Sequence, residues 1–429
     1  MKQISRRQTL AGIGAAAASA ALPWRVLAQA KDPIRIGYLA PLSGASEVIG
    51  RDQLIGAQIA VDQINKEGGL MGRQVELVVR DDGSKPDRGV AVVRELVGSG
   101  INLIVGIYAS PVTLAVADTL KDLNALLMTQ CSALTSLTYE KFTRNLFRPT
   151  EFSLMRQRGI ARLAAMENPQ LKSFGCVTTD IATQIDAWNL VHDGLLEYFP
   201  AMAGHAVDVA EPVRMPAGAA DYRTQISRAM GIRADALYVG MHGGDVITFL
   251  KQQKAYRLLD RFQMAFDAGS EYFVPKTMKK ETPKDYWTAI HWYAPAYAGN
   301  KISDDLYKEA VTRTGGDKYP QGYLAEAHTA VRALATGIQK AQSTDTETLI
   351  SAMEGMSFET CKGTRTFRKE DHQADADVNY IRFGPADNED GWEVTKYQVV
   401  KGVDTIPPAS PGKAFELTFL AGAGIKPLK

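Results

Sequence analysis

The stretch from Ile34 to Arg80, IRIGYLAPLSGASEVIGRDQLIGAQIAVDQINKEGGLMGRQVELVVR, decides the fold class. Its first six residues are an apolar run that predicts a buried strand. Small apolar residues then recur at helical spacing, at Ala57, Ala60, Val61 and Ile64. The glycine pair at 68–69 is typical of a helix end, and residues 75–80 predict a second strand. Strand, helix and strand in this order build a parallel sheet, so the sequence predicts an α/β protein.

The same alternation continues to residue 128 and restarts after Arg148-Pro149-Thr150. In the second part, the sequence predicts strands at 174–178, 236–239 and 263–266, separated by helices at 222–230 and 245–253. A chain of 429 residues has room for two such units. Residues 358–400 differ in texture and predict short strands, with a turn at 388–391.

The first 30 residues have the pattern of an export signal. A basic start is followed by an apolar run from Leu10 to Leu22 and by Ala28-Gln29-Ala30, which predicts cleavage after Ala30. The apolar run has 13 residues, whereas a membrane span needs roughly 20. Residues 5–10, SRRQTL, resemble the twin-arginine signal that exports folded proteins. We therefore expect a mature chain in the periplasm.

The charge balance excludes a basic polymer binder. Lysine and arginine number 49 and aspartate and glutamate number 48, so no strong field attracts nucleic acid or an anionic membrane. Removing the leader's four basic residues, Lys2, Arg6, Arg7 and Arg25, takes the formal net charge from +1 to −3. The mature chain is therefore expected to be mildly acidic and not to bind nucleic acid.

Three cysteines, Cys131, Cys176 and Cys361, lie far apart and show no metal-ligand spacing. An odd count leaves at least one thiol free. One disulfide in an oxidising compartment is one interpretation, and three buried thiols are the other. We favour buried thiols because cysteine is often buried as a small hydrophobe.

Catalytic signatures are missing from the sequence. It contains no HExxH, no GxSxG elbow and no P-loop, so no catalytic residue, metal or cofactor is expected. The densest polar cluster is residues 369–377, KEDHQADAD. It is either a metal site or a solvated hairpin end, and we favour the hairpin end because no ligand spacing is diagnostic.

Ser110-Pro111 predicts an anion site. Serine is a preferred N-cap and proline is favoured at the first helical position, and both follow directly after a predicted strand. A helix N-terminus at the carboxyl end of a strand attracts a carboxylate through its free N–H groups. The alternative is a cap that serves only its own helix. Residues 128–135 are rich in small and hydroxyl residues and form the matching loop after the next strand.

Several motifs together carry a family resemblance. GYLAPLSG at 37–44 is followed by Gly50, Gly56-Ala57, Gly68-Gly69 and Asp81-Asp82, and later by Val105-Gly106, DALYVG at 235–240 and Gly322-Tyr323. The mature chain resembles, over nearly its whole length, the periplasmic branched-chain amino acid binding family. Members of that family are solute-binding subunits of ABC importers.

The resemblance implies a periplasmic binding protein fold of type I, with two Rossmann-like lobes, a ligand cleft between them and a three-strand hinge. The first lobe is expected to take residues 31–150 and 292–378, and the second lobe residues 151–291 and 379–429. Hinge closure on one small molecule couples capture to docking on membrane permease subunits. We expect a monomer.

The resemblance also assigns ligand contacts. Ser110 and the loop Cys131, Ser132 and Ala133 are expected to hold the ligand carboxylate and ammonium, although Ala133 replaces the usual threonine. Ile49 and Thr183 stand near the positions of two aromatic contacts of leucine binders. The first-lobe disulfide of relatives would use the position of Ala109 and is absent here.

Asp267 decides the expected ligand class. If its carboxylate faces the cleft, it matches an α-amino group; otherwise a plain carboxylate or an amide fits better, because an unpaired buried ammonium is costly. Tyr108 and His242 are expected to add stacking or polar contacts, with ordinary loop side chains as the alternative for both.

These observations predict an extracytoplasmic binding protein for a branched-chain amino acid, an aromatic acid or an amide. One alternative is a periplasmic sensor that passes its ligand to a membrane receptor. A remoter alternative is a metal-dependent enzyme on the same scaffold that uses residues 369–377.

Overall fold

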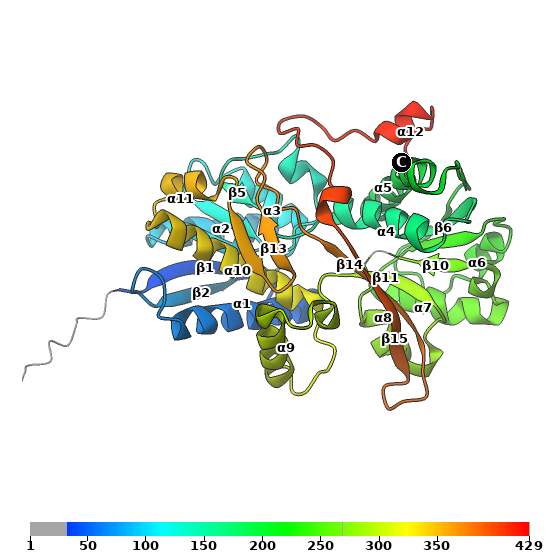
Figure 1. Cartoon of the computed structure of the whole chain (residues 1–429), viewed down its shortest axis with the longest axis horizontal. Helices are drawn as coiled ribbons and strands as arrows, with labels where there is room; N and C mark the ends of the chain where they lie inside the picture. The colour runs from blue at the N-terminus through cyan, green and yellow to red at the C-terminus, as the bar shows by residue number, and fades with distance from the viewer. Residues whose placement is uncertain (1–31, 268, 429) are drawn as a thin grey trace, which may run out of the picture. The chain divides into compact units, whose positions relative to one another are not determined.

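The computed structural model describes residues 32–267 and 269–428 (Figure 1). The predicted export signal and its cleavage site lie outside the described residues. None of the helices within these ranges is long and apolar enough to cross a membrane.

The first lobe is built on a parallel sheet with the strand order β2-β1-β3-β4-β5. Its central strands are buried on both faces, which explains why their sequences are apolar runs rather than alternating patterns. The strands are β1 (Ile34–Ala40), β2 (Val75–Asp81), β3 (Leu103–Gly106), β4 (Leu126–Thr129) and β5 (Leu146–Phe147).

Helices cover both faces of this sheet. Helices α1 (Glu47–Lys66), α10 (Gly322–Ala341) and α11 (Thr346–Met353) bury one face, and α2 (Pro86–Gly98) and α3 (Ser110–Ala117) bury the other. A Cβ atom at Gly56 would lie 1.9 Å from the carbonyl oxygen of Leu324. Helix α1 therefore needs glycine there to approach the backbone of α10. Helix α9 (Lys301–Arg313) and the hairpin of β12 (Ser357–Thr360) and β13 (Gly363–Thr366) complete the lobe.

The second lobe is built on a sheet with the order β15-β14-β11-β10-β9-β6-β7, in which β8 also pairs with β6. Strands β6 to β11 pair with one another in parallel, whereas β14 is antiparallel to both β11 and β15. The strands are β6 (Ser173–Thr179), β7 (Asp208–Val209), β8 (Val213–Met215), β9 (Ala236–Gly240), β10 (Met264–Phe266), β11 (Tyr286–Ile290), β14 (Val378–Pro385) and β15 (Trp392–Val400).

This sheet also has helices on both faces. Helices α4 (Ser153–Glu167) and α5 (Ala182–Tyr198) bury one face, and α6 (Arg223–Ala229), α7 (Gly243–Gln253) and α8 (Phe273–Met278) bury the other. Helix α12 (Thr418–Gly422) packs on α5 near the end of the chain. Short helical turns are η1 (Thr135–Thr138), η2 (Phe199–Ala203), η3 (Lys254–Tyr256), η4 (Leu259–Arg261), η5 (Lys279–Glu281), η6 (Ala294–Tyr297) and η7 (Gly402–Asp404).

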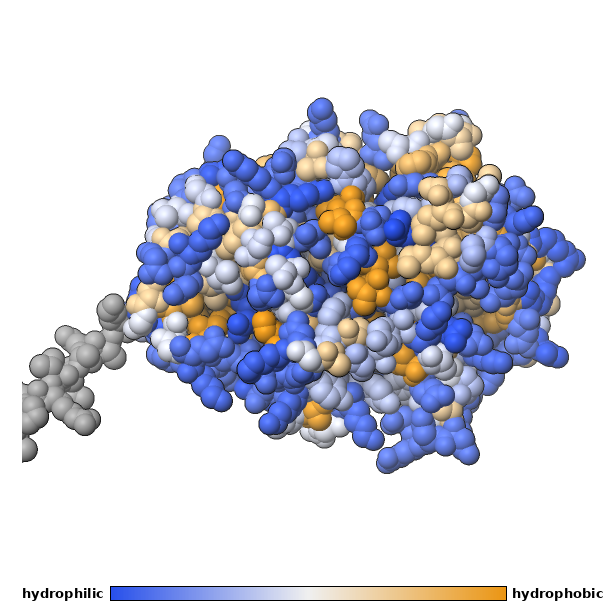
Figure 2. All heavy atoms as spheres, in the orientation of Figure 1, coloured by the Kyte–Doolittle hydropathy of each residue, from blue (hydrophilic) through white to orange (hydrophobic). Residues whose placement is uncertain are grey.

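The chain passes between the two sheets more than once. It leaves the first sheet between β5 and α4, returns between β11 and α9, and crosses again between β13 and β14. The predicted α/β class with two lobes is confirmed. Figure 2 shows a largely hydrophilic face with separate small apolar areas.

Three local predictions need correction. Strands β12 and β13 are short as predicted, with 4 residues each, but β14 and β15 have 8 and 9 residues because they pair with each other and extend the sheet beyond β11. The predicted turn between them is present, with Gly391 N–H donating to Asn388 O at 3.1 Å. Ser110 is the first residue of α3, and Ala109 is the N-cap.

The third correction concerns the cluster at 369–377, which is not a solvated hairpin end. Asp371, His372 and Gln373 are buried. Asp371 pairs with Arg368, the His372 ring stacks on Phe147 at 3.9 Å, and Gln373 Oε1 accepts from the guanidinium of Arg148. The polar groups of these side chains hold the crossing between β13 and β14 against the crossing between β5 and α4.

The structure also shows the state of the three cysteines and the grouping of side chains that could bind a metal ion. Cys131, Cys176 and Cys361 are free and buried. Within the described ranges, no group of three or more His, Cys, Asp or Glu side chains is arranged to hold a metal ion.

Candidate ligand-binding site

The candidate site lies where the carboxyl ends of strands from both lobes meet. The loop after β4 in the first lobe approaches the end of β11 in the second: Cys131 Sγ lies 3.7 Å from His291 Nε2. Open α/β sheets bind ligands at this edge.

A strained turn at the end of β3 shapes the first-lobe side. Gly106 has φ +123° and Ile107 has φ +63°. Positive φ is unfavourable for a β-branched residue such as isoleucine. The Ile107 N–H donates to Leu39 O at 2.7 Å, which holds this turn against β1. The turn is followed by Tyr108, whose ring contacts Tyr323 edge to face at 5.7 Å between centroids.

Ser110 connects the loops after β3 and β4. Its hydroxyl oxygen accepts a hydrogen bond from the Ala133 N–H at 3.0 Å, which leaves the hydroxyl proton to donate elsewhere. In the same loop, the Ser132 Oγ atom is buried and has no hydrogen-bond partner among the described residues. These groups lie in the loops that the sequence predicted to hold a ligand.

Three hydrogen-bonded side chains, Glu271, His291 and Arg156, extend into the site from the second lobe. Glu271 Oε1 accepts from the His291 backbone N–H at 3.1 Å and from the His291 ring at Nδ1, and Glu271 Oε2 accepts from Gly322 N–H at 3.0 Å. Because Nδ1–H donates to the carboxylate, Nε2 of His291 accepts from Arg156 Nη1 at 2.9 Å. Glu271 thus fixes the imidazole, and the imidazole positions the guanidinium.

The surroundings of Glu271 and Arg156 stabilise the charged form of both side chains. Burial raises the pKa of Glu271, but the proximity of His291 and the hydrogen bonds from His291 and Gly322 outweigh it, so this pKa lies below its usual value. Burial lowers the pKa of Arg156, but Cys131, Tyr323 and nearby carboxylates raise it by more than burial lowers it. The pKa therefore lies above its usual value, and the guanidinium stays cationic. Its Nε atom is buried without a hydrogen-bond partner among the described residues.

Cys131, His291 and Glu271 have the order of a nucleophile, a base and an orienting acid. The arrangement is not activated, because the Nε2 lone pair already accepts from Arg156. Burial also raises the pKa of the Cys131 thiol, so the sulfur stays protonated. The site therefore offers a guanidinium, hydroxyls and a thiol for binding rather than a nucleophile.

The second-lobe residues predicted from the sequence lie in different settings. Asp267 is buried, and its Oδ1 atom accepts from Gly269 N–H at 2.9 Å, from Ser270 N–H at 3.0 Å and from Thr288. Of the two carboxylate oxygens of Asp267, only Oδ2 lacks a hydrogen-bond partner among the described residues. A Cβ atom on Gly269 would lie 2.7 Å from Cε1 of His242, so that ring lies against the Asp267 turn.

Thr183 is exposed in the first turn of α5. Within the described part of the chain, no hydrogen bond joins Thr183 to Tyr108, Ser110 or the 131–133 loop. The residues that sequence reasoning missed are Arg156, Glu271, His291 and Tyr323. The His291 and Tyr323 rings are 4.6 Å apart and form an aromatic wall beside the guanidinium.

A buried ionic cluster lies beside the crossings. Lys362 Nζ donates to Glu151 Oε2 at 2.9 Å and to His291 O at 2.8 Å, and it lies 3.9 Å from Glu326 Oε1. Arg365 donates to Pro149 O. Burial and the charge of Glu151 raise the pKa of Glu326 to about 8, although Lys362 and Arg365 lower it. Glu326 therefore stays protonated at neutral pH.

Two α/β lobes with polar groups from both at their strand ends are the architecture of a solute-binding protein. The sequence model of the periplasmic binding protein family matches residues 33–388. The chain belongs to this family and is not an enzyme, as the sequence predicted.

Comparisons with individual proteins point to the same family and fold. The chain is 29% identical over 347 residues to the Leu/Ile/Val-binding protein BraC3 of Rhizobium johnstonii, covering 78% of this chain and 87% of that protein. It is 27% identical over 348 residues to a leucine-, isoleucine-, valine-, threonine- and alanine-binding protein of Pseudomonas aeruginosa, covering 79% and 86%. A solved solute-binding protein of R. palustris in complex with 4-hydroxybenzoate matches with a TM-score of 0.69 at 18% identity, over 86% of this chain and 97% of that one.

Proposed function

We propose that this chain captures a small carboxylate between its lobes and delivers it to the permease of an ABC importer. The observation that carries the proposal is Arg156. Its guanidinium is cationic, it donates from Nη1 to His291 Nε2, and its buried Nε has no hydrogen-bond partner among the described residues. A carboxylate satisfies such a group in a bidentate, charge-assisted geometry.

The proposed ligand has no ammonium group. Both oxygens of Glu271 already accept hydrogen bonds, and Asp267 Oδ1 accepts three. An α-ammonium would have to use Asp267 Oδ2 alone, whereas the rings of Tyr108, His291 and Tyr323 suit an aromatic or apolar body. Both ligand classes occur in this fold, since relatives are named for Leu, Ile and Val binding and one solved structure holds 4-hydroxybenzoate.

The proposal extends to the setting of the protein. The chain is exported, cleaved after Ala30 and acts in the periplasm, as a monomer with one ligand. The lobes divide near residues 150, 291 and 378, and their closure on the ligand presents the complex to the permease.

A thermal-shift screen of the mature protein tests the proposal. The panel contains aromatic and aliphatic monocarboxylates, their primary amides and the corresponding α-amino acids. We expect monocarboxylates to raise Tm most, because a ligand at about 100 times its Kd adds about 2.7 kcal/mol to stability. A panel in which only α-amino acids raise Tm would contradict the ligand class, and a panel without any shift would contradict a binding function.

A further inference from the structure

The chain continues beyond β15 as residues 401–428, which we call the strap. In Figure 1 the strap leaves the end of β15 and runs across to α12, which lies on α5. The family match ends at residue 388, so the strap lies outside the part of the chain that this family shares.

The end of the strap is anchored to the second lobe. Asp193 Oδ1 on α5 accepts from the backbone N–H groups of Phe419 at 2.9 Å and Leu420 at 3.0 Å. One turn earlier on the same helix, Asn189 donates to Leu428 O at 3.0 Å and accepts from Leu428 N–H at 2.8 Å. These four bonds fix both α12 and the last described residue to α5.

The middle of the strap is anchored to the first lobe. The Gly412 N–H donates to the carbonyl oxygen of Tyr139, in the connection between β4 and β5, at 2.8 Å. The Phe415 ring meets the Tyr139 ring edge to face at 5.3 Å between centroids. Arg368, which follows β13, donates to Pro407 O at 2.6 Å. The strap therefore touches the first lobe between two attachments to the second.

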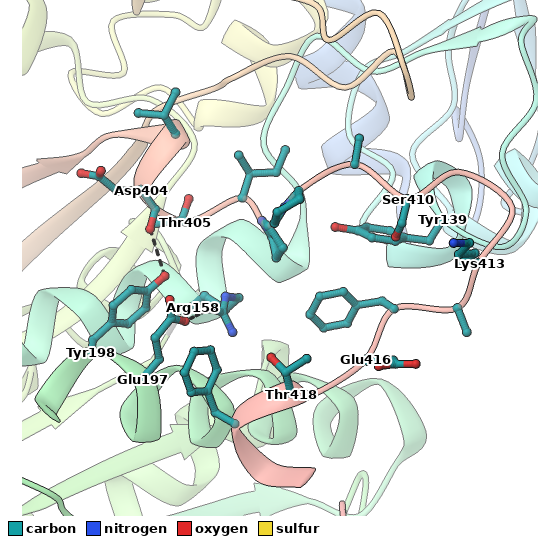
Figure 3. A pocket seen from close by; sticks show the side chains of 18 residues that line it. Tyr139, Arg158, Glu197, Tyr198, Asp404, Thr405, Ser410, Lys413, Glu416 and Thr418 are labelled. Carbon is teal, nitrogen blue, oxygen red and sulfur yellow. Dashed lines mark hydrogen bonds and ion pairs between the residues drawn. The ribbon is translucent and has the colours of Figure 1, made fainter. Parts of the chain in front are cut away.

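The strap does not pack closely over the whole of this path. A cavity of about 620 Å³ lies beneath it, between the strap and α4 and α5. Figure 3 shows Arg158, Glu197 and Tyr198 on one side of this cavity and Tyr139, Ser410 and Lys413 across it. The strap is thus held by separate contacts, of which those to Tyr139 and Arg368 join it to first-lobe segments.

We propose that residues 401–428 are a tether that ties the two lobes together and limits how far they separate in the ligand-free protein. The tether adds to the three chain crossings, and it acts through the contacts of Gly412 and Phe415 with Tyr139. Its action does not depend on which ligand the site takes.

Electron paramagnetic resonance between nitroxide labels tests this proposal on the ligand-free protein. Lys121→Cys in the first lobe and Lys251→Cys in the second place labels at exposed positions, while the native cysteines are buried. We expect Phe415→Ala to shift the distance distribution toward longer values and to broaden it. Gly412→Pro removes the N–H donor to Tyr139 and cannot adopt the φ of +79° at Gly412, so it is expected to release the same contact and to have the same effect.

The matched control is Phe419→Ala. Phe419 lies on the same strap, but its ring faces Arg158 of the second lobe, 5.9 Å from the guanidinium carbon. We expect the distance distribution of this variant to equal that of the parent. Parent-like distributions in both Phe415→Ala and Gly412→Pro would overturn the tether, and so would an equal shift in Phe419→Ala.

Discussion

Replacing Arg156 with methionine is expected to abolish detectable carboxylate binding. Methionine keeps much of the volume but removes the guanidinium that contacts His291 Nε2. Removing one partner of a buried charge pair costs about 2–5 kcal/mol, which corresponds to roughly 30- to 5,000-fold weaker binding. Isothermal titration of the best monocarboxylate from the screen measures this loss.

Arg94→Met is the matched control for this experiment. Arg94 is exposed on α2, and its replacement removes the same charge away from the site. We expect parent-like affinity in the control. A folded Arg156→Met variant that retained the parent affinity would show that the carboxylate is held elsewhere.

Replacing Glu326 with glutamine is expected to remove a large pH dependence of stability. Burial raises the pKa of Glu326 from its ordinary value of 4.5 to about 8 in the folded protein. Between these two values the unfolded chain loses the proton while the folded protein keeps it, so stability falls as pH rises from about 4.5 to about 8. The full penalty is on the order of 5 kcal/mol.

Glutamine has nearly the same shape and does not ionise. Urea unfolding of Glu326→Gln and the parent at pH 5, 7 and 9 is therefore expected to give similar stability at pH 5 and a more stable variant at pH 9. Glu76→Gln, at an exposed position on β2, is the control and is expected to follow the parent. Parallel pH curves for Glu326→Gln and the parent would contradict a buried, protonated Glu326.

The fold was predictable because its signals are local. Apolar runs such as 34–39 and helical spacing such as Ala57 to Ile64 are set by neighbours in sequence, and β1 and α1 lie where these patterns indicate. The cluster at 369–377 was misjudged because local polarity does not reveal burial. Asp371 and Gln373 are polar in order to bind Arg368 and Arg148, the latter more than 200 positions away.

The site was predictable only in part. Ser110 and the loop at 131–133 follow strand ends, and the structure joins them through the bond between Ser110 and Ala133. Asp267 was a candidate because it directly follows β10, with its orientation left open, and its Oδ1 atom is committed to the turn at Gly269 and Ser270. How closely these loops of the two lobes approach each other depends on the packing of the three chain crossings, and periodicity in the sequence carries no information about that packing.

Arg156, Glu271 and His291 come from α4, the loop after β10 and the end of β11. The sequence did not mark Arg156 as a site residue, because the burial of its neighbours Met155 and Gln157 on α4 is seen only in the structure. An arginine at such a position has to meet an anion or an acceptor.

A crystal structure of the protein with its best monocarboxylate tests the central claim most directly. We expect the ligand between the lobes, with both carboxylate oxygens within hydrogen-bond distance of the Arg156 guanidinium and the ligand body against Tyr108 and Tyr323. A carboxylate bound away from Arg156, or a ligand ammonium paired with Asp267 Oδ2, would contradict the account.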